Sequence, residues 1–271
     1  YDKYRGEVLF MRSWWYFNLY RAFGGVPIAH KVVSPADAKT IRRCTDDEMY
    51  ALLTGDLAEA ARLLPASNGA EKARVTDIAA WTLLAKVYLT FGKPGEAKTA
   101  LEEAMKNPNY GLVTTKPEEA QLTQPAPVFR ALYDARDNRL PLISEYTEDK
   151  KGTYLLNKWF DNRNDALKGN VVENDFPHLR YADVVLMYAE ALAESGSSLG
   201  DALVWLNKTR TRAGLDALKA EDIPSKGAFI EALADERGRE FALEGHRWFD
   251  LVRLGLALDR FHEMGYKLDA H

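Results

Sequence analysis

The sequence has only one cysteine, Cys44, in 271 residues, and this excludes an internal disulfide framework or a zinc cage built from cysteines. It has no run of 18 or more apolar residues, so it predicts no membrane-spanning helix. The formal net charge is −4, which provides no global positive field to hold nucleic acid. The 46% hydrophobic and 28% charged residues that are present are typical of a soluble globular protein.

Strand signals are also scarce, and helical periodicity is strong instead. A first helix is predicted over residues 6–23, where apolar side chains recur at helical spacing until a Gly-Gly pair stops the pattern. A second helix is predicted over residues 45–65. It begins at Thr45, which is followed three residues later by Glu48, the spacing of a capping box.

The most regular pattern is a pair of helices within residues 77–106, separated by a tight Gly-Lys-Pro-Gly turn. Large side chains on the first helix alternate with small ones on the second, so the two can approach closely. The order and spacing match the tetratricopeptide (TPR) repeat. The positions that carry the match are Trp81, Leu84, Ala85, Tyr88, Ala97, Leu101 and Ala104.

A second copy of this pattern covers residues 180–212, and a further charged helical segment covers residues 226–255. Because each helix pair needs a neighbour to cover its apolar face, we predict an all-α fold. It would be a TPR-like scaffold with long irregular insertions, in one domain over residues 1–271. The tryptophans of the periodic helices are expected in the core or between helices; they are Trp14, Trp15, Trp81, Trp205 and Trp248.

Residues 107–178 break the helical regularity, because prolines recur along them and aromatic side chains stand among Asn, Asp, Lys and Thr. A long irregular segment on a rigid helical scaffold is where binding function usually lies. We therefore expect the ligand side of the molecule in this insertion.

The stretch ERGREFALEGHRWFDLVRLG, residues 236–255, raises the question of catalysis. Glu236, Glu240 and Glu244 are four residues apart and share one helical face. A metal site would need a histidine three or four residues from an acid, but His246 is two residues from Glu244 and points away from it. Nearby arginines would lower the pKa of a general acid rather than raise it, and they match the acids nearly one for one.

We therefore interpret this stretch as scaffold, with no catalytic residue, metal ligand or cofactor. Its apolar side chains would pack inward, and its Glu and Arg residues would tie it to neighbouring helices. Gly245 would be either a point of close contact or a break between two helices. The side chains expected to face inward are Phe241, Trp248, Phe249 and Leu251.

Three stretches, in order, resemble the SusD/RagB family of outer-membrane lipoproteins: GEVLFMRSWWYFNLYRAFGGVPI, LRYADVVLMYAEALAE with ALVWLNKTRTRAGL, and EGHRWFDLVRLG. They span residues 6–255. The resemblance implies a TPR-based, surface-exposed glycan-binding protein without catalytic activity. It also implies a SusC-type TonB-dependent transporter as partner and a lipid anchor as the only attachment to the membrane. The family's signal peptide, anchor cysteine and first helices have no counterpart here, so we expect a processed or truncated chain, and the middle region is shorter.

Sugar rings have apolar faces and hydroxylated edges, so a glycan site needs exposed aromatic side chains beside polar ones. On this chemistry we predict stacking platforms at Trp159, Tyr154 and Tyr146. The predicted polar partners are Asn157, Asp161, Asn162 and Arg163, with Phe129 and Tyr133 as second choices. Alternatively, KGTYLLNKWFDN is a buried strand or extended segment whose aromatic side chains pack in the core.

Other functions fit parts of the same pattern. The RagB branch of the family handles peptides, which a deep groove with main-chain partners would favour. An unrelated TPR scaffold for a protein tail would need a continuous Asn and Lys/Arg stripe, which the sequence does not show. A helical-barrel glycoside hydrolase would need two carboxylates at a defined separation in a cleft.

Overall fold

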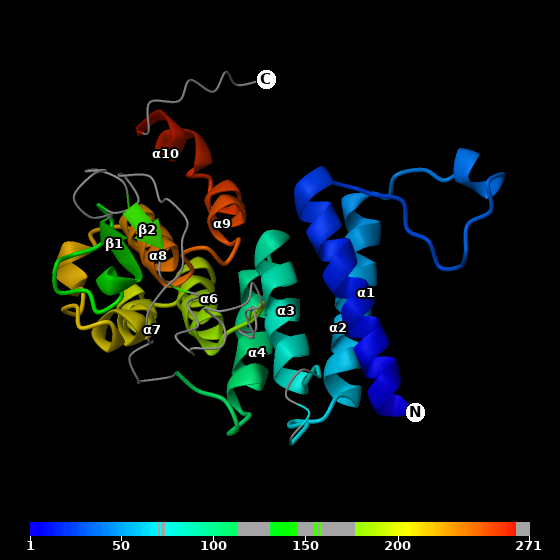
Figure 1. Cartoon of the computed structure of the whole chain (residues 1–271), viewed down its shortest axis with the longest axis horizontal. Helices are drawn as coiled ribbons and strands as arrows, with labels where there is room; N and C mark the ends of the chain where they lie inside the picture. The colour runs from blue at the N-terminus through cyan, green and yellow to red at the C-terminus, as the bar shows by residue number, and fades with distance from the viewer. Residues whose placement is uncertain are drawn as a thin grey trace, which may run out of the picture. The chain divides into compact units, whose positions relative to one another are not determined.

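The computed structural model describes residues 1–69, 71, 74–112, 131–145, 154–156, 158 and 177–263, with residues 142–145 and 154–156 as backbone alone. Over these ranges the chain is helical apart from one short pair of strands, which confirms the predicted all-α class. The chain divides into two compact units, Tyr1–Gly111 and Leu112–His271 (Figure 1). That residues 1–271 form a single domain stays a prediction.

The first unit is built from four helices that pack in chain order, α1 on α2, α2 on α3 and α3 on α4 (Figure 1). They agree with the predicted helices to within a few residues. The helices are α1 (Asp2–Phe23), α2 (Asp46–Leu63), α3 (Asp77–Thr90) and α4 (Pro94–Met105), with a short 3-10 turn η1 (Asp37–Lys39) between α1 and α2.

Local chemistry explains where these helices begin and how closely they pack. At the start of α2 the Thr45 hydroxyl accepts from the Glu48 backbone N–H, and the Glu48 carboxylate accepts from the Thr45 backbone N–H. The predicted capping box is therefore confirmed, and it satisfies two amides that lack helical partners. Between α3 and α4 the predicted small residues Ala85, Ala97 and Ala104 are fully buried, which lets the two backbones approach.

The outer face of α1 differs from the prediction. Trp15 and Phe23 are 61% and 66% exposed, whereas Phe17 is fully buried. Residues two apart on a helix point about 200° from each other, so the face that packs on α2 cannot hold both Trp15 and Phe17. An ion pair holds the inner face of α1 against α2: the Arg12 guanidinium binds both carboxylate oxygens of Asp56 on α2 at 2.7 Å.

The second unit is a group of three mutually packed helices, α6 (Tyr181–Glu194), α7 (Leu199–Arg212) and α8 (Lys226–Glu240). Helix α9 (Arg247–Arg253) packs on α8, and α10 (Ala257–Glu263) packs on α9. Every residue from 182 to 193 in α6 is buried, so α6 is central. A short 3-10 turn, η3 (Ala220–Asp222), lies between α7 and α8.

The predicted helical segment over residues 226–255 is divided, because α8 ends at Glu240 and a turn separates it from α9. Gly245 lies in that turn with a φ of 72°, and a Cβ placed there would contact nothing. It is therefore a break and not a close contact. Phe241 and Leu251 are buried as predicted, but Trp248 is 51% exposed and is not a core residue.

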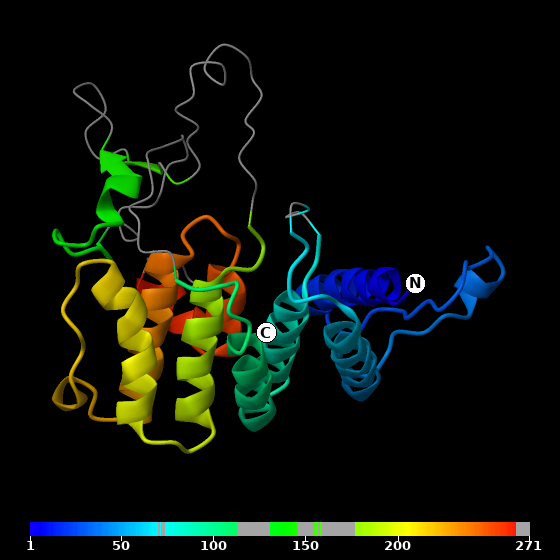
Figure 2. The same cartoon turned by 90° about the horizontal axis from the view of Figure 1, so that it is seen from below.

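A two-stranded antiparallel sheet, the β1–β2 pair, lies within the predicted insertion. It follows a 3-10 turn, η2 (Leu140–Leu142), and joins β1 (Ile143–Glu145) to β2 (Tyr154–Leu156) with Ser144 opposite Leu155. Figure 2 shows it beyond the end of α7, and the Asn138 N–H donates to the Ala213 carbonyl there at 2.7 Å. Among the helices that the structure describes, none is long and apolar enough to cross a membrane.

Candidate functional site

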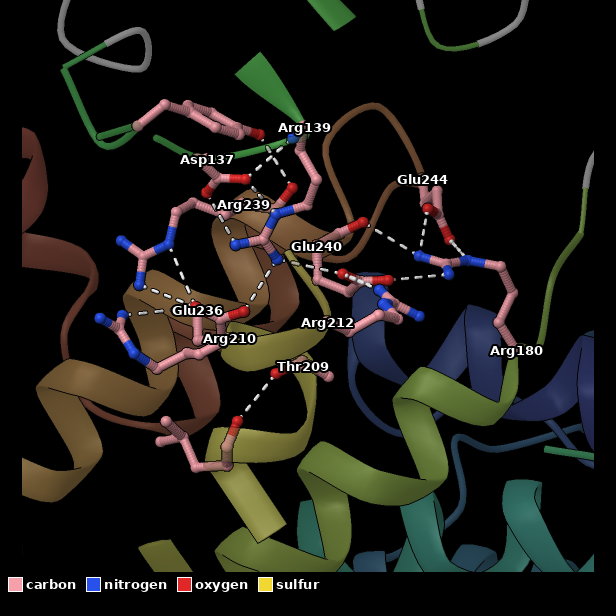
Figure 3. A network of polar contacts seen from close by, with 12 residues as sticks. Asp137, Arg139, Arg180, Thr209, Arg210, Arg212, Glu236, Arg239, Glu240 and Glu244 are labelled. Atoms are coloured by element: carbon pink, nitrogen blue, oxygen red, sulfur yellow. Dashed lines mark hydrogen bonds and ion pairs between the residues drawn. The ribbon is translucent and has the colours of Figure 1, made fainter. Parts of the chain in front are cut away.

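The candidate site is built at the C-terminal end of α8, where three carboxylates are buried. Glu236 and Glu240 lie on α8, one turn apart, and Glu244 follows in the turn before α9. Their side chains are 0%, 3% and 1% exposed. Buried carboxylates require charged partners, and cations converge on these three from several segments (Figure 3).

We call this group the α8 ion cluster. Its acids are held by one lysine and five arginines that come from before β1, after β2, before α6, the end of α7 and α8 itself. The members are Asp137, Arg139, Lys158, Arg180, Arg210, Arg212, Glu236, Arg239, Glu240 and Glu244.

Arg139 connects the segment before β1 to α8. Its Nη1 donates to Glu236 at 2.8 Å and to Glu240 at 3.1 Å. Its Nε and Nη2 bind both oxygens of Asp137 at 2.9 and 2.8 Å. The Arg139 side chain is itself buried, at 8% exposed. It binds buried carboxylates on two segments at once.

Lys158 makes the corresponding connection after β2. Its ammonium donates to the Glu240 carbonyl at 2.7 Å and to the Glu244 carboxylate. The Glu240 carbonyl is at the end of α8, where helical carbonyls lack intrahelical partners and favour a cation. Lys158 therefore satisfies both a helix end and a buried acid.

Helices α6 and α7 complete the cluster. Arg180, which directly precedes α6, binds both oxygens of Glu244 at 2.7 and 2.8 Å and donates to Glu240 at 3.0 Å. Arg212, at the end of α7, donates to Glu240 as well. Glu240 is thus shared by cations from three segments and is the centre of the cluster.

The charges of the cluster set the protonation state of its central acid. Burial by itself would raise the pKa of Glu240, but Arg180, Arg212 and Arg139 outweigh it and lower this pKa from 4.5 to about 2. Burial lowers the pKa of Lys158, and the neighbouring Glu244 opposes that shift. A carboxylate held ionised between guanidinium groups is a poor proton donor, so this arrangement favours positioning over acid catalysis.

A second buried cluster, the α6–α9 ion cluster, connects α6, α8 and α9. Its members are Asp183, Glu190, Arg237, Asp250 and Arg253. Arg237, 1% exposed, pairs with Asp183 of α6 at 2.9 Å and with Asp250 of α9 at 2.8 Å. Arg253 of α9 pairs with Asp250 and with Glu190 of α6. These pairs join α8 and α9 to α6.

The two clusters confirm that the Glu and Arg residues of this stretch tie it to neighbouring helices. The near-equal number of acids and arginines in the stretch does not mean that they all pair with one another, although Arg237 and Arg253 both pair with Asp250. Of the three glutamates only Glu236 pairs within the stretch, with Arg239; Glu240 and Glu244 take distant cations. His246 stacks on Phe241 with ring centroids 4.6 Å apart. No group of acids, histidines or cysteines suited to a metal occurs among the described residues.

Most of the predicted ligand-binding residues fall outside the part of the chain that the structure describes. These are Trp159, Tyr146, Asn157, Asp161, Asn162, Arg163 and Phe129. Tyr154 is the first residue of β2, described as backbone, which agrees with the extended alternative for its stretch. Tyr133 is 6% exposed and its hydroxyl donates to the Arg239 carbonyl at 2.8 Å, so it packs against α8 and offers no open stacking face.

Sequence reasoning missed the residues that hold the β1–β2 pair to α8. Arg139 and Lys158 lie in a segment without periodicity, and their partners are 97 and 86 residues away. The sequence signal for them was indirect, since three acids spaced four residues apart require cations from elsewhere if they are buried.

Two family models match parts of the chain. The model of the SusD family matches residues 137–271, and a model described as "Starch-binding associating with outer membrane" matches residues 1–89. The SusD-like protein P2 of Formosa agariphila is 24% identical over 336 aligned residues, which cover 96% of this chain and 66% of that protein. The chain therefore spans about two thirds of the length of this relative.

Solved structures share the fold. A SusD superfamily protein from Bacteroides vulgatus superimposes with a TM-score of 0.83 at 23% identity, covering 100% of this chain and 73% of the other. A structure described as a laminarin binding SusD-like protein gives a TM-score of 0.78 at 22% identity, with 99% and 74% covered. At these identities the likeness establishes the architecture.

Proposed function

The chain belongs to the SusD/RagB family, and on that premise we propose that it is a binding protein for glycans at the surface of the outer membrane. The family membership is the observation that carries the proposal. A similar structure is described as laminarin binding, and the family model over residues 1–89 is described as starch-binding. Both ligands are glucose polymers, so we take starch and laminarin as the first ligands to test.

The proposed ligand side is the segment around the β1–β2 pair, with Trp159, Tyr154 and Tyr146 as stacking platforms. Asn157, Asp161, Asn162 and Arg163 would bind hydroxyl groups beside them. Support comes from the anchoring of this segment, because Arg139 and Lys158 fix both sides of the pair to buried carboxylates. A rigid support keeps binding side chains in place and lowers the entropy cost of binding.

The test is a calorimetric titration of the chain with soluble starch and with laminarin. Trp159→Ala should weaken binding by about 30-fold, the loss of about 2 kcal/mol that truncating a central aromatic contact costs. Trp15→Ala is the matched control, because Trp15 is an exposed tryptophan of α1 outside the proposed site, and it should leave the affinity within about twofold. Binding of peptides and of neither polysaccharide would reject the glycan and favour the RagB-like alternative.

We further propose that the protein acts beside a SusC-type TonB-dependent transporter and passes its ligand on without a catalytic step. A pull-down from detergent-solubilised outer membranes should recover a large β-barrel transporter. Recovery of soluble proteins alone would contradict this partnership. Incubation with each polysaccharide should leave its chain length unchanged, whereas shortening of the polymer would reveal a hydrolase.

A further inference from the structure

The β1–β2 pair is attached to the helices by charge on both of its sides. Arg139 comes four residues before β1, and Lys158 comes two residues after β2. Both reach the end of α8, where Glu236, Glu240 and Glu244 receive them. Figure 3 shows Arg139 above Glu236 and Glu240. Lys158 donates to the Glu240 carbonyl and to the Glu244 carboxylate.

These attachments are buried and specific. The side chains of Arg139 and Lys158 are 8% and 13% exposed, so solvent screens their ion pairs little. Arg139 is also bound to Asp137 of its own turn, so its position fixes the backbone that leads into β1. Lys158 binds a main-chain carbonyl and a carboxylate, which fixes the chain that leaves β2.

An uncharged contact supports the same attachment on the side of α7. The turn before β1 lies against Gly214, which follows α7, and the Asn138 N–H donates to the Ala213 carbonyl. A Cβ added to Gly214 would lie 2.8 Å from Nδ2 of the Asn138 side chain and 3.2 Å from the Arg136 carbonyl oxygen. Position 214 also has a φ of 81°, which glycine adopts without strain.

We propose that Arg139 and Lys158 are positioning residues that fix the β1–β2 pair on the end of α8 and thereby set the affinity for the glycan. The glycan part of this inference rests on the proposed function. Neither residue need touch the ligand. Their effect is transmitted through the backbone of the two strands, which carries Tyr154 and lies next in sequence to the other proposed platforms.

The competing explanation is that the cluster only stabilises the packing of α6, α7 and α8. The two explanations differ in what the loss of one cation changes. If the cluster positions the strands, removing Lys158 loosens the β1–β2 pair specifically. If it serves the helices alone, the same change lowers the free energy of unfolding of the whole unit. Amide exchange in the strands then speeds up only as much as exchange in the helices does.

The experiment compares Lys158→Met with Arg253→Met in the full chain. The two side chains are equally buried, each 13% exposed, and each pairs with buried acids, but Arg253 belongs to the α6–α9 ion cluster. Amide hydrogen exchange is measured by mass spectrometry on peptides that cover residues 143–145 and 154–156. We expect Lys158→Met to speed exchange there at least tenfold, and Arg253→Met to leave it within about twofold of the parent.

Two further variants keep the test decisive. Lys158→Arg retains the charge and should restore most of the protection that Lys158→Met removes. Gly214→Ala changes no charge and should speed exchange in 143–145 by displacing the turn at residues 136–138. It provides the readout if Lys158→Met does not fold. Unchanged exchange in a folded Lys158→Met variant, or in Gly214→Ala when it is the readout, overturns the inference.

Titration of the same variants with laminarin and soluble starch separates this inference from the proposed function. If the parent binds either polysaccharide, Lys158→Met should weaken that binding at least tenfold while Arg253→Met leaves it unchanged. If Lys158→Met loosens the strands but binds as tightly as the parent, positioning of the ligand site is rejected. If the parent binds neither polysaccharide, the proposed function fails, and the exchange data still decide whether the cluster holds the strands.

Discussion

Glu240 shows how one buried side chain can organise several segments. Its carboxylate contacts arginines from the segment before β1, from the residue before α6 and from the end of α7. These contacts outweigh the cost of burying a charge, as the lowered pKa of Glu240 shows. Removing this charge would leave three cations beside a neutral group. Breaking a buried ion pair in this way is strongly destabilising, because the remaining buried charges lose their partner.

We therefore expect Glu240→Gln to lower the free energy of unfolding by about 3–5 kcal/mol, the cost typical of breaking a buried pair. Chemical denaturation followed by circular dichroism measures it. Glu231→Gln is the matched control, because Glu231 lies on the same helix, is 48% exposed and pairs with Arg260. Its cost should stay below about 1 kcal/mol. Equal costs for the two variants would contradict the central role of Glu240.

At the scale of single elements, some of the described helices are delimited by residues close to their ends. The capping box of α2 is the clearest case, since Thr45 and Glu48 satisfy each other's backbone amides. The turn between α8 and α9 is another, with Gly245 in a positive-φ conformation. The β1–β2 pair is different, because three residues per strand cannot stabilise a sheet without support from the helices.

The capping box gives a prediction for α2. Thr45→Ala should lower the free energy of unfolding by about 1 kcal/mol, because the first turn of the helix loses its side-chain acceptor. Thr99→Ala in α4 is the control, since Thr99 is exposed and bonds only the carbonyl one turn before it. This substitution should change the free energy of unfolding by less than about 0.5 kcal/mol. A loss at position 99 as large as that at position 45 would argue against a capping effect.

At the scale of the whole molecule, two ion clusters make the second unit sensitive to acid. Glu240 has its pKa lowered from 4.5 to about 2, and Asp250 from 3.8 to about 2. For Asp250, burial by itself would raise the pKa, but the opposite effect of Arg237 and Arg253 is larger and lowers it. When the pH falls below 4.5 and 3.8, the ordinary pKa values of Glu240 and Asp250, these groups bind protons in the unfolded chain but not in the folded chain. The free energy of unfolding therefore falls as the pH falls.

We expect the free energy of unfolding to be highest above about pH 5 and to decline from pH 4.5 toward pH 2. The shift of Glu240 alone corresponds to about 3 kcal/mol. Urea unfolding at a series of pH values measures the decline, and Glu240→Gln should flatten part of it. A stability that stays constant between pH 5 and pH 3 would show that these carboxylates are not held ionised.

How far the sequence predicted the candidate site differs from residue to residue. The spacing of Glu236, Glu240 and Glu244 predicted that they lie near one another, but it did not predict that they are buried. Tyr133 was assigned to the ligand and is in fact packed against α8, because aromatic side chains in irregular segments have no period that shows which way they face. The partners of Glu240 were not predictable, since they lie 28 to 101 residues away in sequence.

The sequence by itself determined most of the helices, the capping box of α2, the helix-pair pattern and the resemblance to the SusD/RagB family. All of these depend on residues a few positions apart, where backbone geometry fixes which side chains meet. Only the tertiary structure decided that α8 ends at Glu240, that Trp15 and Trp248 are exposed, and that Arg139 and Lys158 hold the β1–β2 pair. These outcomes follow from which segments pack together, because burial and ion pairing between distant segments are properties of the folded chain.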